Sequence, residues 1–462
     1  MEPTNNNTKD TKKEKTASTS GAQYNVLTGA EMGKVVTRFP PEPSGYLHIG
    51  HVKAAMLNYH YSKMYNGKMI LRFDDTNPAK EKEEYVDNIK KDLATLEIFP
   101  DEVTHTSDYF ENLMKIMTQM ISEGKCYCDN TCVEVMRKER TEGTPSKCRD
   151  QTVEQNLAIW EQMCLPHPDP EIKKYCVRGK IDFKNNNKCL RDPVFYRFSE
   201  EVHHRLGNKY KIFPTYDFAC PIVDSLEGVT HCLRTNEYSD RIPMYKWVQK
   251  AGNFREVFIY EFSRLNLIHT VLSKRNLKWF VDSKHVESWT DPRFPTVQGI
   301  LRRGIRVQTL KDFMLAQGPS KSTNLMEWDK IYALNKEIVD TTAKRLFAVD
   351  AVNHVPVFIE NLSSNEEVHV DWHQKNKELG QRMQARPNSV LIESEDARDI
   401  VEGLKLTLYK WGNSLVTKVE KEGEQVKAVH VKLTPEDLVF KNTKIVHWVP
   451  ADSKLVSYII YY

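Results

Sequence analysis

The sequence predicts an α/β protein with a parallel sheet, followed by a helical segment and a separate β-rich module. Two observations support this prediction. Short apolar runs alternate with stretches of helical periodicity over residues 35–124, which is the pattern of a parallel sheet with crossover helices. From about residue 352 onward, apolar and polar residues alternate with period two, which is typical of antiparallel strands.

Length and composition narrow the class of protein. A chain of 462 residues is too long for one core, so we expect three or four domains. The formal net charge is only +3, so a nucleic-acid surface would have to arise by local segregation of charge. No apolar run approaches the roughly 20 residues that cross a bilayer, and we expect no membrane partner.

The first 32 residues and the cysteines indicate the compartment. Residues 1–32 are rich in Asn, Thr, Lys and Ser, which predicts a disordered tail. This tail lacks arginine and carries Glu2, Asp10 and Glu14, unlike a mitochondrial transit peptide. Nine cysteines lie in the middle of the chain with no secretory signal before them, so we expect reduced thiols and a cytoplasmic location.

A strand, a tight turn and a helix start follow one another near the N-terminus. Residues 35–39 form the predicted strand, and a run rich in Pro and Gly then breaks the backbone. The free N–H groups and the dipole of a helix start favour bound phosphate. His48 and His51 fall on one face there and can donate to phosphate oxygens, whereas the alternative is two histidines satisfied within the protein.

The next strand, residues 69–73, ends at Asp74, and helices are expected over 81–96 and 110–121. The carboxyl ends of parallel strands share one edge of the sheet, so Asp74 and the turn should converge on one crevice. Residues 126–208 have many Cys and Pro and weak periodicity, and we interpret them as an inserted domain. Cys126, Cys128, Cys132 and Cys148 could ligate zinc, but their spacing fits no standard site, so we favour buried thiols.

The α/β pattern resumes over residues 211–224, and 229–234 is again strand-like. A helix is expected over 240–252. Residues 271–275 place two cations beside a serine, which suits a mobile loop closing over a polyphosphate; a solvated charged loop is the alternative.

Residues 283–345 look helical and include the basic cluster Arg302, Arg303 and Arg306, for which a solvated face is the default interpretation. Strands are then expected over 404–409, 415–419, 426–433 and 445–449, with turns at 412–413 and 422–424. The chain stops at residues 459–462, apparently in mid-strand, so we expect a partner strand or a following segment.

Several motifs together resemble one family. The sequence HIGH at 48–51 resembles the signature of class I aminoacyl-tRNA synthetases, and VLSKR at 271–275 resembles their KMSKS loop, with Val271 in place of the first lysine. The segments 38–43, 72–78, 216–221 and 291–296 are similar to the glutamyl/glutaminyl-tRNA synthetase group. The resemblance runs from about residue 35 to the C-terminus, and the β-rich end resembles the archaeal and eukaryotic branch.

The resemblance implies a class I synthetase fold with a Rossmann-like catalytic domain, an inserted acceptor-binding domain, a helical connecting domain and a C-terminal β-barrel anticodon-binding region. The expected boundaries are a tail at 1–32, catalytic halves at 33–125 and 209–282, the insertion at 126–208, the connecting domain at 283–345, and the barrel, apparently incomplete, at 346–462.

The implied reaction is ATP-dependent activation of L-glutamate to glutamyl-adenylate and transfer to the 3′ end of tRNA(Glu), with Mg²⁺ arriving on ATP. His48, His51 and Lys274 would be catalytic, and Gly50 would let the adenine approach. The implied ATP-binding residues are Glu42, Pro43, Ser44, His48, Gly50, His51, Lys53, Thr235, Arg264, Leu265, Leu272, Ser273 and Lys274.

The choice of amino acid depends on the side chain. A γ-carboxylate needs a fixed cation, and Arg234 lies where the glutamyl enzymes carry that arginine. The alternative interpretation of Arg234 is an ordinary surface salt bridge with a nearby Glu or Asp. The implied glutamate-binding residues are Arg38, Pro40, Glu42, Asp74, Tyr216 and Arg234.

Three other functions are alternatives to glutamate–tRNA ligation. A glutaminyl-tRNA ligase is disfavoured by Arg234, and a small-molecule nucleotidyltransferase would not need the β-rich module. A non-catalytic tRNA-binding relative would have lost the ATP motifs, yet His48, His51, Ser273 and Lys274 are present. The sequence leaves open the oligomeric state, charging of tRNA(Gln), and a multisynthetase or scaffold partner.

Overall fold

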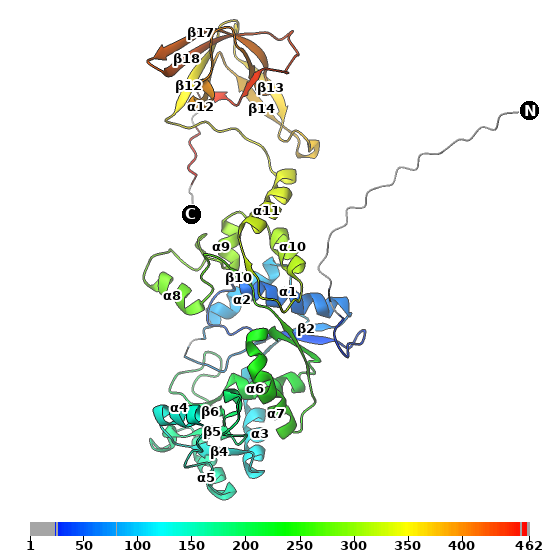
Figure 1. Cartoon of the computed structure of the whole chain (residues 1–462), viewed down its shortest axis with the longest axis vertical. Coiled ribbons are helices and arrows are strands. Elements are labelled where there is room, and N and C mark those ends of the chain that lie inside the picture. Colours follow the sequence, from blue (N-terminus) through cyan, green and yellow to red (C-terminus); the bar gives the residue numbers. More distant parts are fainter. Residues whose placement is uncertain (1–23, 25, 80, 453–454, 460–462) are drawn as a thin grey trace, which may run out of the picture. The chain divides into compact units, whose positions relative to one another are not determined.

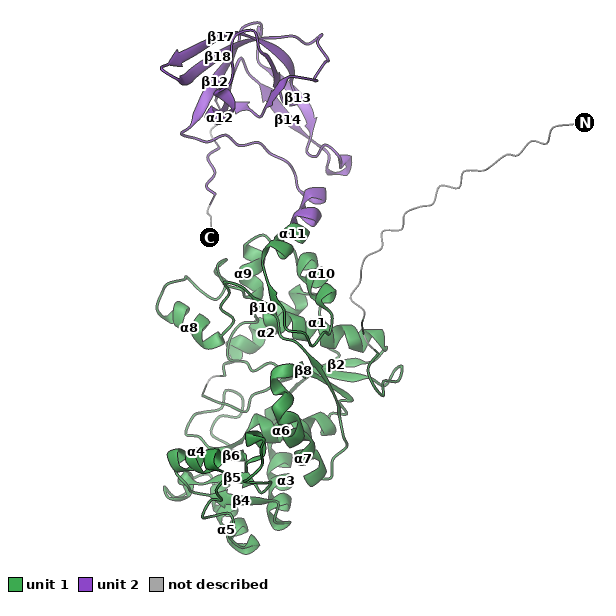
Figure 2. Ribbon diagram, viewed as in Figure 1, with its two compact units in different colours: residues 1–334 green, residues 335–462 purple. Residues whose placement is uncertain are grey.

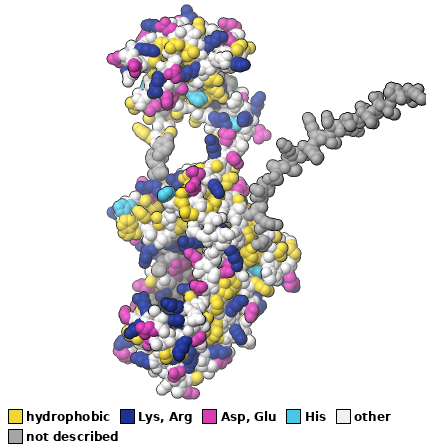
Figure 3. All heavy atoms as spheres, in the orientation of Figure 1, with side chains coloured by type: hydrophobic (Ala, Val, Ile, Leu, Met, Phe, Trp, Pro, Cys, Tyr) yellow, Lys and Arg dark blue, Asp and Glu magenta, His cyan; other side chains and the backbone are white. Residues whose placement is uncertain are grey.

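The computed structural model describes residues 24, 26–79, 81–452 and 455–459. The chain divides into two compact units, Met1–Leu334 and Asn335–Tyr462 (Figure 2). The described helices are each too short or too polar to cross a bilayer. On the face drawn in Figure 3, basic and acidic side chains are interspersed over each unit, in keeping with the small net charge of +3.

The first unit is built on parallel strands, as predicted (Figure 1). One sheet has the order β1-β2-β3, and β8 pairs with β9. The edge of β8 lies against β1, because the Thr230 N–H donates to the Val36 carbonyl over 2.9 Å. The strands are β1 (Val36–Phe39), β2 (Lys68–Phe73), β3 (Glu102–His105), β8 (His231–Thr235) and β9 (Phe258–Phe262).

Helices connect these strands where periodicity predicted them. The expected helices at 81–96, 110–121 and 240–252 are α2 (Glu83–Thr95), α3 (Phe110–Ser122) and α7 (Ile242–Ala251). The helix after the first turn is α1 (Ile49–Met64). Its residues Val52, Ala55 and Met56 pack into one apolar core with β1 and β2, so the helix start is fixed relative to the strand ends.

The insertion forms an antiparallel sheet in the order β4-β5-β6-β7. Its core is shared with the flanking helices, because Phe110, Phe218 and Val248 belong to the same apolar cluster as Cys126 and Cys128. The sheet also reaches β7, beyond residue 208. The elements are β4 (Cys126–Asp129), α4 (Val133–Glu142), α5 (Val153–Met163), η2 (Ile172–Lys174), β5 (Cys176–Gly179), η3 (Lys188–Leu190), β6 (Val194–Phe198) and β7 (Ile212–Pro214).

The segment 211–224 differs from its expected strand. Only β7 is extended, and α6 (Tyr216–Leu226) follows as a helix although Pro221 lies inside it. Phe218 and Ile222 are four residues apart and both fully buried, so tertiary packing of one helix face outweighs the local cost of proline. The structure thereby turns the Tyr216 region into a helix start facing β8.

The remaining elements of the first unit are mostly helical, as expected for residues 283–345. They are η1 (Thr106–Tyr109), η4 (Asn236–Arg241), β10 (Asn266–Leu267), α8 (Lys274–Asp282), α9 (Val297–Arg302), α10 (Val307–Gln317) and β11 (Leu325–Met326). Helix α11 (Asp329–Thr342) begins in the first unit and ends in the second, because the division falls after Leu334.

The expected tail at 1–32 ends earlier than the composition indicated. Leu27 is 1% exposed and packs with Val35, Leu57 and Tyr61, and the Tyr24 hydroxyl donates to the Leu315 carbonyl over 2.9 Å. The average composition of residues 1–32 is polar, so it did not reveal that Tyr24 and Leu27 pack against the rest of the protein. Residues 1–23 and 25 of the expected tail lie outside the described residues.

The second unit is a sheet curled into a half-barrel, with strand order β19-β16-β17-β18-β12-β15-β20. Its two edge strands are separated by only two residues in sequence, so the chain itself joins the opposite edges. Strands β13 and β14 pair with each other as a hairpin and form a separate two-stranded sheet. The elements are β12 (His354–Ile359), β13 (Glu366–Asp371), η5 (Lys377–Leu379), β14 (Gln381–Arg386), β15 (Ser389–Glu393), α12 (Ser394–Ala397), β16 (Lys405–Leu408), β17 (Gly412–Glu422), β18 (Gln425–Leu433), β19 (Lys444–Val446) and β20 (Val449–Pro450).

Two expectations for this unit need correction. Gly412 and Asn413 are not a turn, because they pair with Leu408 and Thr407 as the start of β17. The reversal instead uses Lys410, whose φ is +60°. The turn at 422–424 is as predicted, with Gly423 at φ +62°. Of the expected terminal strand, residues 460–462 lie outside the described residues, and 455–459 contain no strand.

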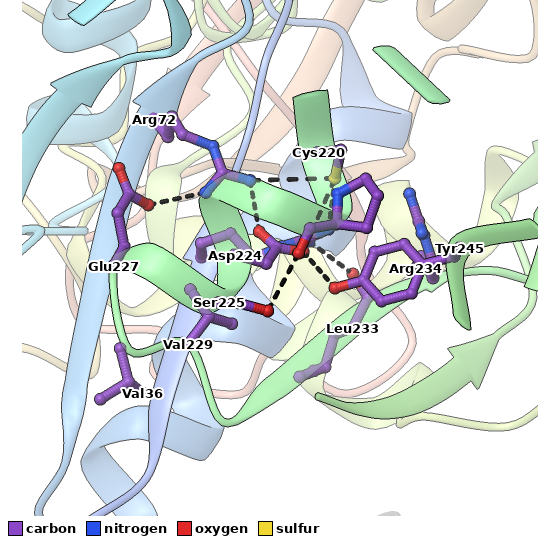
Figure 4. A network of polar contacts seen from close by, with 12 residues as sticks. Val36, Arg72, Cys220, Asp224, Ser225, Glu227, Val229, Leu233, Arg234 and Tyr245 are labelled. Atoms are coloured by element: carbon purple, nitrogen blue, oxygen red, sulfur yellow. Dashed lines mark hydrogen bonds and ion pairs between the residues drawn. The ribbon is translucent and has the colours of Figure 1, made fainter. Parts of the chain in front are cut away.

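One buried carboxylate joins the strands of the first unit (Figure 4). Asp224 of α6 accepts from Arg38 Nε over 3.1 Å, from the Tyr245 hydroxyl over 2.7 Å, and from Arg72. Arg72 also pairs with Glu227 over 2.6 Å. Arg38 and Arg72 come from β1 and β2, so this network fixes both strands against α6. Burial opposes the charge on Asp224, but the two guanidinium groups hold its pKa below the ordinary value.

Replacing this carboxylate should destabilise the first unit. Asp224→Asn leaves two buried guanidinium groups without their shared counterion, and we expect the free energy of unfolding to fall by about 3 kcal/mol. Because the Asp224 pKa is lowered on folding, this contribution is present at neutral pH and is lost as pH falls below about 4. Urea unfolding followed by tryptophan fluorescence measures the change. Glu111→Gln, which removes a solvent-exposed pair with Lys209, is the control, and an equal loss in both variants would contradict the account.

Candidate active site

A cavity of about 410 Å³ opens at the carboxyl ends of β1 and β8, beside the first turn that was expected to bind a ligand. It brings together residues from the first turn, from α1, from α6, from β8 and from the start of α8. The lining residues are Arg38, Phe39, Pro40, Pro41, Glu42, His51, Ala54, Asn58, Tyr216, Leu233, Arg234, Thr235, Tyr238, Phe262 and Lys274.

The two histidines of the first turn have defined tautomers. The Gly50 N–H donates to His48 Nδ1 and the His48 N–H donates to His51 Nδ1, each over 3.1 Å. Because both Nδ1 atoms accept, each neutral ring carries its proton on Nε2. Burial, with Lys274 nearby, lowers the pKa of His48 to about 3 and that of His51 well below its ordinary value. The pair therefore presents two neutral N–H donors at a helix start.

Gly50 has a different role from the one expected. A Cβ at this position would lie 3.0 Å from Cε1 of the His48 ring. The space above the glycine is therefore filled by the histidine, and not left open toward an adenine. Glycine is needed here so that the His48 ring can fold back over the helix start.

Lys274 connects the second motif to the first. Its Nζ donates to the Glu42 carbonyl over 2.9 Å and to Ser44 Oγ over 3.3 Å. Burial lowers the pKa of Lys274 to about 8, with Glu42 acting in the opposite direction. Lys274 begins α8, Ser273 is its N-cap, and Leu272 packs on the core. The 271–275 segment is thus docked on the turn rather than solvated.

Arg234 has a buried guanidinium group, and some of its N–H donors have no hydrogen-bond partner in the described structure. Its side chain is 7% exposed, and only Nη2 donates to a protein group, the Tyr216 hydroxyl. Nε and Nη1 have no hydrogen-bond partner in the described structure. Among the described residues no carboxylate pairs with Arg234, so the surface salt bridge weighed earlier does not form. An unpaired buried cation beside a cavity favours an anionic ligand.

Arg38 also lines the cavity but is already partnered. It pairs with Asp224, and its Nη1 donates to the Leu233 carbonyl over 3.3 Å. Burial opposes its charge, but Asp224 raises the pKa of Arg38 above its ordinary value. Of the two arginines in the cavity, Arg234 therefore carries the uncompensated charge.

Asp74 lies at the adjacent strand end, as expected, although it is not among the residues lining the cavity. Its N–H donates to the Pro41 carbonyl over 3.0 Å, which holds the end of β2 against the first turn. Burial raises the pKa of Asp74 to about 7, and a hydrogen bond from Thr76 opposes this shift. A cation bound there would be most favourable above neutral pH.

Nine of the expected ATP-binding residues are not among those that line the cavity: Pro43, Ser44, His48, Gly50, Lys53, Arg264, Leu265, Leu272 and Ser273. Lys53 Nζ donates to the Ser263 carbonyl over 2.6 Å, and Lys53 lines a separate small recess with Arg264 and Leu265. Arg264 pairs with Glu237 over 2.6 Å, and Leu265 is in the apolar core. Thr235 and Pro40 do line the cavity, while the Pro43 carbonyl accepts from Lys82 over 3.2 Å.

The sequence did not identify Tyr238, Phe262 or Asn58 as residues of the cavity. The ring of Tyr238 is 3.4 Å from the centre of the Arg234 guanidinium. Tyr238 follows Arg234 by four residues through a 3₁₀ turn, η4, and no periodicity marks that turn. Only the resemblance of neighbouring segments could have directed attention to it.

The cysteines weighed as zinc ligands lie apart from any group of candidate ligands. Cys126 and Cys128 pack in the apolar core, and burial raises the pKa of Cys128 to about 12. In the described part of the chain, the group that could hold a metal ion is Glu81, His203 and His204. His203 is already engaged, because its Nε2 bonds to the Asp75 carbonyl over 2.9 Å and its Nδ1 accepts from the Arg205 N–H.

The fold and the cavity define a class of protein. A parallel sheet carries a neutral histidine pair at a helix start and a lysine from a later segment, and these are the parts of a class I aminoacyl-tRNA synthetase catalytic domain. Residues 34–341 match the family of tRNA synthetases class I (E and Q), catalytic domain, and residues 343–434 match the anti-codon binding domain of the same group. The chain therefore belongs to the class I tRNA synthetases of the glutamate and glutamine group.

Named relatives agree with this family. The chain is 48% identical to the bifunctional glutamate/proline–tRNA ligase of Mus musculus over 93% of its length and 28% of that protein. It is 48% identical to the cytoplasmic glutamate–tRNA ligase of Arabidopsis thaliana, over 93% of this chain and 60% of the relative. The cytoplasmic glutamate–tRNA ligase of Saccharomyces cerevisiae is 47% identical, over 88% and 57%. The chain thus spans less than two thirds of each of these relatives.

A solved structure is also similar, at a low level. The glutamate tRNA ligase of Elizabethkingia meningosepticum aligns with a TM-score of 0.49 and 17% identity over 68% of this chain and 71% of that one. The assignment to the family therefore depends on the sequence matches.

The shifted pKa of Lys274 predicts an alkaline limit for ATP use. Its ammonium loses a proton above about pH 8 in the free protein, so kcat/KM for ATP should fall about tenfold per pH unit beyond that point. Bound phosphates favour the charged form, so the limb in kcat should lie at higher pH. Steady-state kinetics at saturating glutamate between about pH 6 and 10 measures both limbs. A flat kcat/KM profile through pH 9 would contradict the burial-based shift.

Proposed function

We propose that this chain is a glutamate–tRNA ligase that activates L-glutamate with ATP and transfers it to the 3′ end of tRNA(Glu). The observation that carries this proposal is Arg234, a buried guanidinium in the lining of the cavity whose Nε and Nη1 atoms have no hydrogen-bond partner in the described structure. A γ-carboxylate satisfies those donors and neutralises the charge, whereas the amide of glutamine would leave the cation uncompensated.

The cavity is lined by groups of two kinds. His51 and Lys274 can donate to phosphate oxygens, and Arg234 and Tyr216 line the same cavity together with residues of the first turn. In the proposed reaction, the substrate α-carboxylate attacks the α-phosphate of ATP and pyrophosphate leaves. The histidine Nε2–H donors and Lys274 would stabilise the charge that develops on the phosphate oxygens, and Mg²⁺ would arrive with ATP. Asp74, at the end of β2, would hold the substrate ammonium.

The expected ATP set is accordingly divided. Glu42, His51, Thr235 and Lys274 line the cavity and stay proposed for ATP, as do their sequence neighbours Pro43, Ser44, His48, Leu272 and Ser273. The contacts of Lys53, Arg264 and Leu265 favour a supporting role, and Gly50 makes room for the His48 ring. Arg38 and Pro40 remain proposed on the glutamate side. We also propose that the chain works in the cytoplasm, as the names of its plant and yeast relatives indicate.

The domain roles follow the same proposal. Residues 126–208 would bind the acceptor end, 283–345 would connect the domains, and 346–462 would read the anticodon. The second unit carries a surface suited to RNA. Lys344 Nζ lies 4.7 Å and the Arg382 guanidinium 5.6 Å from the ring of Trp372, and Arg386 lies 5.6 Å from Trp411. Cations interleaved with aromatic faces bind single-stranded nucleic acid.

Parallel charging of total tRNA with glutamate and with glutamine tests the proposal. We expect glutamate to be charged with at least about 100-fold higher kcat/KM, because glutamine leaves a buried cation unpaired. Pyrophosphate exchange with and without tRNA shows whether activation requires the nucleic acid. Charging of glutamine alone, or ATP binding without any charging, would contradict the proposal and favour the glutaminyl or the non-catalytic alternative.

Removing the charge of Arg234 should affect glutamate alone. For Arg234→Gln we expect kcat/KM for glutamate to fall about 1,000-fold, with the KM for ATP within about twofold of wild type. Lys34→Gln, at an exposed side chain outside the cavity and outside residues 126–208, is the control and should be unchanged. Retention of normal glutamate use by Arg234→Gln would show that another group reads the γ-carboxylate.

The basic surface of the second unit should affect tRNA alone. Arg382 lies over the ring of Trp372 and pairs with no carboxylate among the described residues, so its charge is available to phosphates. We expect Arg382→Ala to raise the KM for tRNA about tenfold and to reduce its salt dependence, with the KM for ATP and glutamate unchanged. Lys427→Ala, on exposed β18, is the control. Equal effects of the two variants on tRNA would place the RNA elsewhere.

A further inference from the structure

Tyr238 covers one face of Arg234. Its ring centre lies 3.4 Å from the guanidinium carbon, closer than the rings of Tyr216 at 5.7 Å and Tyr245 at 5.3 Å. Contact at this distance places the guanidinium flat on the ring. Arg234 and Tyr245 are drawn together in Figure 4.

The ring of Tyr238 is itself held in place. Its hydroxyl donates to Asp217 Oδ1 over 3.1 Å, and the other oxygen of Asp217 pairs with Arg241. Asp217 follows Tyr216 directly at the start of α6. Two consecutive residues of one helix therefore fix Arg234 from two directions. Tyr216 bonds to its edge, and Asp217 holds the ring that covers its face.

This arrangement matches what recognition of a carboxylate requires. A guanidinium and a carboxylate bind best when their planes coincide, so a free rotation of Arg234 would weaken the interaction. Among the described residues Arg234 has no carboxylate partner, and its charge is compensated only by aromatic faces. A ring face attracts a cation without occupying its N–H donors, so the donors at Nε and Nη1 stay free for a ligand.

We propose that Tyr238 is a positioning residue that selects a substrate with a side-chain carboxylate by fixing the plane of Arg234, and that Asp217 and Arg241 hold Tyr238 for this purpose. The inference rests on the proposed function, because it concerns how the same cavity reads its amino acid. It predicts a role for the ring, not for the hydroxyl's contact with substrate.

Three variants separate this role from a merely structural one. Tyr238→Leu removes the ring, Tyr238→Phe keeps it, and Arg241→Gln loosens the Asp217 clamp at a position that is 47% exposed. For Tyr238→Leu we expect the KM for glutamate to rise about tenfold and the preference for glutamate over glutamine to fall by a similar factor. Tyr238→Phe keeps the ring but loses the hydroxyl that Asp217 holds, so Tyr238→Phe and Arg241→Gln should each raise the KM for glutamate about threefold, less than Tyr238→Leu.

In each variant kcat and the KM for ATP should remain within about twofold of wild type, since Lys274 and the histidines are untouched. A glutamate KM unchanged in both Tyr238→Leu and Arg241→Gln would overturn the inference. So would a parallel loss of kcat, ATP use and thermal stability, which indicates a structural role. If Tyr238→Leu does not fold, the KM for glutamate of Arg241→Gln alone tests the inference, and an unchanged value would overturn it. Wild type assayed alongside tests the proposed function separately, because failure of wild type to charge glutamate concerns that proposal and not Tyr238.

Discussion

The carboxylate of Asp224 is the interaction on which the first unit depends. It lies fully buried between Arg38 of β1 and Arg72 of β2, and it also accepts from Tyr245. Two strands and two helices thus meet at one counterion. The consequence for the cavity is a difference between its arginines. Arg38 is neutralised within the protein, whereas Arg234 keeps its charge for a ligand.

The cavity is assembled from segments that are far apart in sequence. Lys274 donates to the Glu42 carbonyl and to Ser44 Oγ, more than two hundred residues earlier, so two hydrogen bonds fix the later motif to the first turn. The histidines are neutral because burial lowers the pKa of each ring, and backbone N–H groups at their Nδ1 atoms leave the proton on Nε2. His51, Lys274 and Arg234 line one cavity with the first turn, so the proposed phosphate chemistry and carboxylate recognition share one site.

Local pattern predicted much of this architecture. The helices α2, α3 and α7 have one apolar face each, and periodicity located them to within a few residues. Pattern failed at α6, where tertiary packing outweighed a proline, and at Gly412, which lies in a strand. The motifs located His48, His51, Lys274 and Arg234, but Tyr238 and the Asp224 network depend on contacts between distant segments. No spacing along the chain encodes such contacts.

A crystal structure with a non-hydrolysable glutamyl-adenylate analogue tests the central claim most directly. We expect the γ-carboxylate of the analogue to lie within hydrogen-bond distance of Arg234, with an oxygen about 2.7–2.9 Å from Nη1 or Nε. We also expect the phosphate oxygens to lie beside the histidine Nε2 atoms and Lys274, and Arg38 to remain paired with Asp224. A γ-carboxylate bound by Arg38 alone, with Arg234 turned away from the ligand, would contradict the account.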